Sequence, residues 1–323
     1  MKLSIIMPAY NSEKFIEKTI GSILSQTFTD YELLCTDDGS TDSTGKILDE
    51  FAKNDSRVKV FHQPRNMGIE EARKRCLENC AGEYIGFVDS DDILHPQMYE
   101  LMFEAAEKHN ADIVMCEYLE TAEGEEIQFE PLEYDEEKVS VVDMDERYRR
   151  MNSRGRECMF MTALWNKIYR SELFMAALPD RPTEDLEINV RALHRTEELL
   201  FVDYPLYFYT YIDNSSSHRP SWWHQLLEYR FRIDEYITEN LPKYADATHI
   251  RTFKHVLSTR ENTKDTLYAA EAKKVMKKHF KPFKKRFMSA DGIGFATKAE
   301  YMLMYRLPFL YRMIRNLTDS KDQ

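Results

Sequence analysis

Two aspartates separated by one residue, Asp89 and Asp91, have the residue type and spacing of a metal-binding site. They follow the apolar run Tyr84 to Val88, so both carboxylates are expected to point toward one place at the end of a strand. Mg²⁺ and Mn²⁺ prefer oxygen ligands, usually one or two carboxylates together with substrate phosphates. Such an ion would neutralise a departing diphosphate. The alternative is a capped turn without a ligand, because Asp and Ser are also common turn residues.

A second polar cluster, Asp37 to Asp42, follows the apolar run Tyr31 to Cys35. Gly39 permits a tight turn there, and the hydroxyl side chains after it can begin a helix. A carboxylate in this turn can accept a hydrogen bond from the imide of a uracil ring. The alternative is a helix N-cap cluster that binds no ligand.

A third polar segment, Asn66 to Gly68, is typical of a turn with left-handed backbone or of a loop that touches a nucleotide. Arg73 follows it, a few residues into a predicted helix. From there its guanidinium can reach a base or a phosphate. On most helices such an arginine is solvated, so both interpretations stay open.

The elements that must position these residues alternate regularly over the first 120 residues. Short apolar runs predict five strands, at residues 3–7, 31–35, 58–61, 84–88 and 113–116. Helical patterns lie between them, with Asn11 or Ser12 expected to cap the first helix and Thr41 or Asp42 the second. This alternation predicts an α/β fold, a parallel sheet with helices on both faces. Ligands bind beyond the carboxyl ends of the strands in such sheets, so the three clusters that directly follow strands, Pro8 to Asn11, Asp37 to Ser40 and Asp89 to Asp92, should share one edge.

The chain beyond residue 116 has a weaker pattern. Residues 117–147 are crowded with Glu and Asp and predict a solvated loop, with an acceptor-binding role as the alternative. An aromatic-rich strand is expected at 205–209, and helical spacing dominates from Trp222 onward. We therefore place a domain boundary near residue 220.

Composition narrows the class of protein. The 323 residues are 43% hydrophobic, enough for a buried core, and the formal net charge of −12 argues against nucleic-acid binding. Five cysteines without framework spacing fit a reducing compartment. The N-terminus lacks the layout of a signal peptide and no apolar run is long enough to span a membrane, so the cytosol is expected.

The C-terminal region differs from the rest in charge. Residues 251–323 carry 17 Lys and Arg against 7 Asp and Glu. Eight of these cations lie between Lys273 and Arg286, and aromatic residues and methionines mix with arginines after Tyr301. One interpretation is a helix that contacts an anionic membrane. The other is a helical cap that packs on the catalytic domain with its lysines in water.

Five segments resemble, in order and spacing, the motifs of family 2 inverting glycosyltransferases, which have the GT-A nucleotide-diphospho-sugar transferase fold. The segments are Ser4 to Asn11, Asp37 to Asp42, Asn66 to Gly68, Ala72-Arg73 and Phe87 to Asp92. The resemblance is continuous to about residue 118. It resumes at Leu164 to Lys167 and at Glu184-Asp185, which are similar to features of bacterial polysaccharide-building members. One departure is Lys74-Arg75-Cys76, where the family usually has Asn and then a small residue.

The resemblance implies roles for the residues that match. On the nucleotide side, Asp37 would hold the uracil edge, Arg73 would brace the nucleotide and Asp89 would contact the ribose. The remaining nucleotide contacts would come from Pro8 and Tyr10, which line the base pocket, and from the loop that contains Asn66 and Gly68.

The resemblance also implies a metal and a base. Asp91 would ligate the Mn²⁺ or Mg²⁺ that bridges the diphosphate, and His218 lies in a late loop that offers a further metal contact in some members. Asp185 would be the general base that takes the proton from the acceptor hydroxyl, with inversion by direct displacement. Glu184-Asp185 also fits a helix start, because Pro182 and Thr183 precede it and acids favour the first turn.

The sequence thus predicts a GT-A catalytic domain over residues 1–220, with a nucleotide-binding half (1–118) and an acceptor-side half (119–220), and a basic helical region over 221–323. The predicted function is sugar transfer from a UDP-sugar to a glycan or lipid-linked acceptor. A non-catalytic nucleotide-binding protein of the same fold is the first alternative. A haloacid-dehalogenase-like phosphatase is the second, because Asp89 and Asp91 also end an apolar strand in Asp-x-Asp. No Gly-x-Gly turn follows the first strand, which argues against a dehydrogenase.

Overall fold

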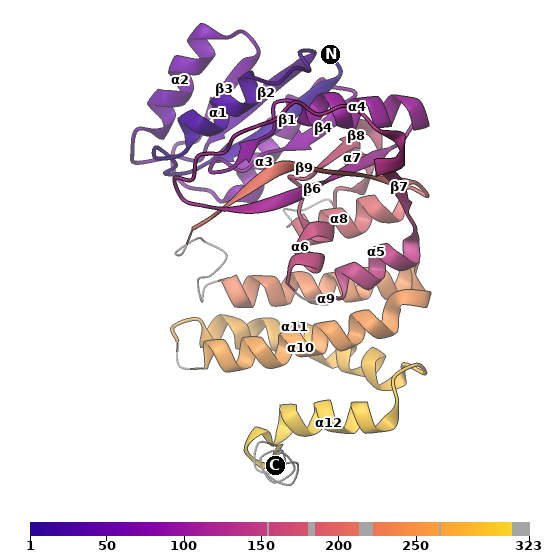
Figure 1. Ribbon diagram of the computed structural model, residues 1–323. Helices are drawn as coiled ribbons and strands as arrows, with labels where there is room; N and C mark the ends of the chain where they lie inside the picture. The colour runs from indigo at the N-terminus through magenta and orange to yellow at the C-terminus, as the bar shows by residue number, and fades with distance from the viewer. Residues whose placement is uncertain (154, 180–184, 213–221, 265, 312–323) are drawn as a thin grey trace, which may run out of the picture. The chain divides into compact units, whose positions relative to one another are not determined.

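The computed structural model describes residues 1–153, 155–179, 185–212, 222–264 and 266–311. The chain divides into two compact units, Met1–Ile212 and Asp213–Gln323 (Figure 1).

The first unit is built on one mixed sheet. In the described part of the chain the sheet has nine strands, in the order β3-β2-β1-β4-β8-β6-β9-β5, with β7 paired to β9 outside this path. The strands are β1 (Leu3–Ala9), β2 (Tyr31–Asp37), β3 (Val58–His62), β4 (Tyr84–Phe87), β5 (Ile93–Leu94), β6 (Ile113–Ala122), β7 (Val139–Val142), β8 (Lys167–Arg170) and β9 (Leu199–Tyr211).

The expected parallel arrangement is present in one half of this sheet. β1 pairs in parallel with β2 and with β4, and β2 pairs in parallel with β3. Both faces of this half are covered, so β1 and β2 are buried at every residue, including polar residues such as Ser4 and Glu32. In the other half β8 runs antiparallel to β4 and β6, while β9 runs parallel to β6.

Helices cover both faces of the sheet (Figure 1). α1 turns one apolar face inward, with Ile16, Ile20 and Ile23 fully buried. The helices of this unit are α1 (Ile16–Leu24), α2 (Thr44–Asn54), α3 (Ile69–Leu77), α4 (Met98–His109), α5 (Met144–Met151), α6 (Arg156–Thr162), α7 (Ser171–Ala177) and α8 (Asp185–His194), with a short 3₁₀ turn, η1 (Glu136–Lys138).

The prediction of a solvated loop over residues 117–147 was wrong at both ends. β6 continues to Ala122, and β7 and α5 occupy most of residues 139–147. Hydropathy misses α5 because Arg147 is fully buried in it and donates hydrogen bonds to backbone carbonyls, including those of Val142 and Leu193. The strand expected at 205–209 is confirmed as the middle of β9.

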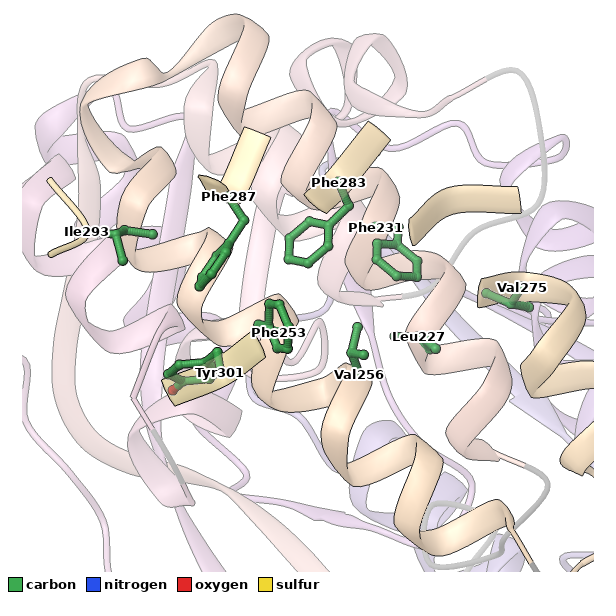
Figure 2. Packing of buried hydrophobic residues seen from close by; sticks show 9 residues of the cluster. All are labelled: Leu227, Phe231, Phe253, Val256, Val275, Phe283, Phe287, Ile293 and Tyr301. Carbon is green, nitrogen blue, oxygen red and sulfur yellow. The ribbon is translucent and has the colours of Figure 1, made fainter. Parts of the chain in front are cut away.

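The second unit is helical, as predicted for the C-terminal region. Its elements are α9 (Trp222–Asn240), η3 (Pro242–Tyr244), α10 (Ala245–Thr263), α11 (Ala269–Ser289) and α12 (Phe295–Arg306). Figure 2 shows the aromatic core that joins them. Phe253 of α10 lies 4.8 Å from the ring centre of Phe287 and 5.2 Å from that of Tyr301, so α10, α11 and α12 share one core.

Most lysines of α11 lie on an exposed face, whereas Arg286 donates to the buried Asp234 at 3.0 Å. Lys273, Lys274, Lys277, Lys281 and Lys285 are exposed, whereas the aromatic residues of the same helix are buried or half-buried. In the described segments, no helix has the length and apolar character to cross a bilayer.

Candidate active site

The polar clusters singled out from the sequence meet at one edge of the sheet. β1, β2 and β4 are parallel neighbours, and their register places Ala9 beside Asp37 and Ile6 beside Phe87. The chain leaves all three strands at this edge, where the Asp38 amide still donates to the Ala9 carbonyl at 2.9 Å. The predicted convergence of the three clusters is therefore confirmed.

The loops after β1 and β2 are interlocked by side chains. Asn11, which has a left-handed backbone (φ 51°), accepts a hydrogen bond from the Thr41 amide at 2.9 Å. The Glu13 carboxylate accepts from the Ser43 amide at 2.9 Å, and the Asp42 carboxylate accepts from the Glu13 amide at 3.1 Å. The prediction that Asn11 or Ser12 caps the first helix was wrong. α1 begins at Ile16 without a side-chain cap, because these polar groups bind the neighbouring loop instead.

Asp37 and Asp38 are both buried at the end of β2, and their carboxylates bind different parts of the chain. Asp37 accepts from the Ser40 amide at 2.9 Å, and its other oxygen lies 3.0 Å from Nδ1 of His62. Asp38 accepts from the amides of Met67 and Gly68, at 2.7 and 2.8 Å. The segment from Asn66 to Gly68 is thereby held beside the turn after β2. Sequence reasoning predicted this neighbourhood but not the role of Asp38.

Glycine is required in the turn after β2. Gly39 has φ 67°, and a Cβ there would lie 2.4 Å from the backbone carbon of Arg65. Gly68 has φ 97°, so the predicted left-handed backbone of the third segment is confirmed. Of the two residues expected in a base pocket, Pro8 is buried in β1 and Tyr10 is 44% exposed just beyond it.

The Asp89-Ser90-Asp91 turn follows β4 directly and is tied to its neighbours. The Ser90 hydroxyl shares a hydrogen bond with the Ser12 hydroxyl at 2.7 Å, and Thr19 of α1 donates to the Ser90 carbonyl at 3.1 Å. Asp92, which sequence reasoning did not single out, is fully buried.

Burial and mutual repulsion make this turn electrostatically unusual. Burial, followed by the charge of Asp91, raises the pKa of Asp89 to about 7; Asp185 adds to the rise and Arg73 opposes it. Burial also raises the pKa of Asp91, and it raises the pKa of Asp92 well above the ordinary range. Three crowded carboxyl groups that are costly to ionise are a site where a cation is stabilising.

The donor set fits Mg²⁺ or Mn²⁺, because these ions need few protein ligands when substrate phosphates complete the shell. Among the described residues no cluster of three or more His, Cys, Asp or Glu side chains is arranged to hold a metal by itself. His218 and Glu184 lie outside the described residues.

Arg73 and Asp185, 112 residues apart in the sequence, form an ion pair. Arg73 is buried on α3, and Asp185 is the first described residue of α8. The cations that follow Arg73, Lys74 and Arg75, are exposed, while Cys76 is buried. The departure from the family pattern therefore leaves the packing of α3 against the sheet intact.

The segment Leu164 to Lys167 lies behind the site. Lys167 is fully buried and donates to the carbonyls of Phe160 and Ala163, at 3.0 and 2.7 Å, and to Asn166 Oδ1 at 2.7 Å. Burial lowers the pKa of Lys167 to about 7, and the negative charge of Asp185 partly opposes this shift. Trp165 stacks on Tyr207 of β9, with ring centres 4.4 Å apart.

A small pocket of about 120 Å³ opens beside Asp91. It lies between the start of α1, with Lys14 just before the helix and Lys18 within it, and the end of β6 near Thr121. Thr210 of β9 also lines it. Nothing in the local sequence indicated this pocket, because its walls come from four separate parts of the chain.

Comparison with known proteins agrees with this geometry. The model of the family described as glycosyl transferase family 2 matches residues 4–175. The uncharacterized glycosyltransferase EpsJ of Bacillus subtilis (strain 168) is 34% identical over 223 residues, which span 68% of this chain and 63% of EpsJ.

Solved structures share the fold. TarS from S. aureus in complex with UDP-GlcNAc superposes with a TM-score of 0.68 at 19% identity, covering 95% of this chain and 92% of that one. The mannosyltransferase PcManGT from Pyrobaculum calidifontis, in complex with GDP-Man and Mn²⁺, gives a TM-score of 0.53 at 12% identity over 97% and 82% of the chains. The haloacid-dehalogenase-like alternative is not supported, because more than half of the chain matches a different family. The chain belongs to glycosyl transferase family 2.

Proposed function

We propose that the protein is a metal-dependent, inverting glycosyltransferase that moves a sugar from a UDP-sugar to an acceptor hydroxyl during assembly of a cell-surface polysaccharide or glycan. The observation that carries the proposal is the meeting, at one sheet edge, of the crowded Asp89-Ser90-Asp91 turn with the Arg73–Asp185 ion pair. Family membership and the shared fold of TarS, which was solved with UDP-GlcNAc, support the choice of a nucleotide-sugar donor.

The donor would lie across the ends of β1, β2 and β4. Asp37, held by Ser40, presents its carboxylate to the imide edge of uracil, and Pro8 and Tyr10 border the base. The loop with Asn66 and Gly68 closes one side of the nucleotide. Because Asp38 fixes that loop through two amides, it is ordered before the donor arrives. Arg73 braces the nucleotide and Asp89 contacts the ribose.

Asp91, with His218 as a further ligand, would hold Mn²⁺ or Mg²⁺. The ion supplies charge neutralisation for the departing diphosphate. Asp185 accepts the proton of the attacking acceptor hydroxyl, which displaces the diphosphate in line and inverts the anomeric carbon. A base positioned in this way contributes roughly 10²–10⁴-fold to the rate.

The ion pair gives Arg73 a second task in this scheme. Its guanidinium holds the Asp185 carboxylate at the start of α8. It also lies near enough to Asp89 to oppose, in part, the rise in the pKa of that residue. One buried cation therefore links the donor side of the site to the base. The carboxylate is oriented by a partner that is itself fixed on α3.

The direct test is ligand binding by thermal shift. UDP, GDP, CDP and dTDP would be screened with and without Mn²⁺ on the wild type, on Asp91→Ala and on Asp203→Asn, an exposed aspartate of β9 as control. A ligand at 100 times its Kd stabilises by about 2.7 kcal/mol. We expect a UDP shift that needs metal and is lost in Asp91→Ala alone. If no nucleotide shifts the wild type, a non-catalytic partner of the same fold is the better account.

Turnover is tested separately through Asp185→Asn. UDP release from a panel of UDP-sugars, with aryl glycosides as acceptors, should fall by roughly 10²–10⁴-fold while UDP affinity stays within a few-fold of the wild type. Equal turnover of the variant and the wild type would remove Asp185 from the role of base.

We further propose that the protein acts in the cytoplasm at the inner face of the membrane, where a lipid-linked acceptor would be presented. The support is the exposed lysine face of α11 and the exposed side chains of Met288 and Phe295, 41% and 84% accessible. Each lysine near an anionic surface contributes about 1 kcal/mol. Flotation with phosphatidylglycerol vesicles should show binding at low salt that is lost at high salt and in Lys277→Gln/Lys281→Gln/Lys285→Gln. Absence of binding by the wild type would favour the helical cap.

A further inference from the structure

We propose that Tyr207 of β9 is a positioning residue that sets the geometry of the Asp89-Ser90-Asp91 turn through its hydroxyl. The inference deepens the proposed function and rests on it, because it concerns the carboxylates that would serve the donor and its metal. Tyr207 is fully buried, so it acts through the turn and does not touch a substrate.

The hydroxyl of Tyr207 takes the place of a strand partner at the end of β4. The β1–β4 ladder ends with Phe87, and the next amide, that of Val88, still donates to the Ile6 carbonyl at 3.0 Å. The following amide, that of Asp89, donates instead to Tyr207 Oη at 3.2 Å. The first backbone group beyond the ladder is thus bound by a side chain 118 residues further along the chain.

Asp92 completes the connection at the other end of the turn. Tyr207 donates its hydroxyl proton to Asp92 Oδ2 at 2.5 Å, and the Thr210 amide donates to Asp92 Oδ1 at 2.8 Å. The Asp92 amide closes the turn on the Asp89 carbonyl at 3.2 Å. Both ends of the turn are therefore bound to β9, and Asp91 lies between them.

The tyrosine is itself held rigidly. Its ring stacks on Trp165 at an interplanar angle of 18°, and its backbone pairs with Leu94 of β5, the strand that follows the turn. β9 thus contacts the turn at its start, through the Asp89 amide, and at its end, through Asp92, and it also pairs with the strand that follows. A change at the Tyr207 hydroxyl would be passed to Asp89 and Asp91 as a small displacement, and supporting hydrogen bonds of this kind typically change metal affinity 10- to 100-fold.

Tyr207→Phe removes the hydroxyl and keeps the ring. Tyr204→Phe is the matched control: it lies on the same strand, is equally buried, and its hydroxyl donates to the Glu133 carbonyl at 2.7 Å. Mn²⁺ binding would be measured by electron paramagnetic resonance of the free ion, with and without UDP, together with the melting temperature of each protein. We expect Tyr207→Phe to weaken Mn²⁺ binding at least about tenfold, and Tyr204→Phe to leave it unchanged.

A second pair of variants guards against misfolding, since Tyr207→Phe alone leaves the buried Asp92 carboxylate short of a donor. Asp92→Asn and the double variant Asp92→Asn/Tyr207→Phe differ only in the hydroxyl, in a background without that charge. The double variant should bind Mn²⁺ several-fold more weakly than Asp92→Asn.

The outcomes separate the two proposals. Equal Mn²⁺ affinity in wild type and Tyr207→Phe, or equal losses in Tyr207→Phe and Tyr204→Phe, would overturn the positioning role while the donor site stands. A wild type that binds Mn²⁺ neither alone nor with UDP would overturn the metal-dependent function itself, and the positioning role with it.

Discussion

Replacing Asp89 by asparagine should make the metal-free protein more stable at neutral pH. In the wild type, burial and the charge of Asp91 raise the pKa of Asp89 from 3.8 to about 7. The folded state therefore binds this proton more tightly than the unfolded state does, and the wild type loses stability as the pH rises from about 4 to about 7. Asparagine has nearly the same shape and cannot ionise, so the variant avoids that loss.

The size of the effect follows from the shift. Each pKa unit corresponds to 1.36 kcal/mol, so a rise of about three units amounts to roughly 4 kcal/mol. Asp89 keeps part of its solvent exposure, and we therefore expect about half, on the order of 2 kcal/mol, at pH 8. For a unit of this size that corresponds to a melting temperature about 5 °C higher.

The assay is thermal unfolding from pH 5 to pH 8.5 in the presence of a chelator. The control is Asp203→Asn, the same chemical change at an exposed position of the same unit. The gain of Asp89→Asn should be small at pH 5, grow through pH 6 to 7 and level off above pH 7.5. Added Mn²⁺ should stabilise the wild type and reduce the difference, since a cation relieves the same repulsion.

A stability gain that is independent of pH, or one that is largest at pH 5, would contradict this prediction. Either result would mean that Asp89 is ionised at ordinary pH without cost, and that the crowded carboxylates do not favour a cation at this turn. Asp203→Asn gaining as much as Asp89→Asn would have the same meaning.

Three further predictions concern the surroundings of the site. Gly39→Ala should lower the free energy of unfolding, measured in urea, by at least about 3 kcal/mol, and Gly124→Ala by only about 1–2 kcal/mol. Both glycines have positive φ, but only at Gly39 would a Cβ meet backbone, that of Arg65. Equal losses would contradict the steric argument. Asp38→Ala should lower stability by about 2–3 kcal/mol and weaken UDP binding measured by calorimetry, because two amides lose a charged acceptor, with Asp38→Asn intermediate. Lys167→Met should lower the free energy of unfolding most near pH 9.5 and progressively less toward pH 7. The native pKa of about 7 lies below that of a free lysine, so the wild type itself loses stability as the pH falls through this range. A loss that is constant with pH would contradict this prediction.

The convergence of the polar clusters could be predicted because it depends only on local patterns and one general rule. Alternating strands and helices imply a parallel sheet, and parallel strands end at one edge, so Asp37 and Asp89 were expected at the same edge. The need for glycine at position 39 likewise follows from a tight turn after a strand.

The contacts between distant segments could not be predicted in this way. Asn11 and Asp42 have the residue types of helix caps, yet they bind each other's loops across about 30 residues. Arg147 counts as a solvated charge in any hydropathy pattern, but it is buried because backbone carbonyls of a later segment accept its hydrogen bonds. Tyr207 was expected only as part of an apolar strand, and its link to Asp89 requires the packed fold.

The position of β9 in the chain has a consequence for synthesis and recombination. The family match ends at residue 175. The strands that carry the proposed donor ligands are all synthesised well before Tyr207. The carboxylate turn therefore completes its hydrogen bonds only when the last strand of the sheet docks, so a nascent or truncated chain that ends before β9 has the ligands without their alignment. A natural or engineered chimera that exchanges the second half of the domain would therefore keep the carboxylates aligned only if it contains both Asp92 and Tyr207.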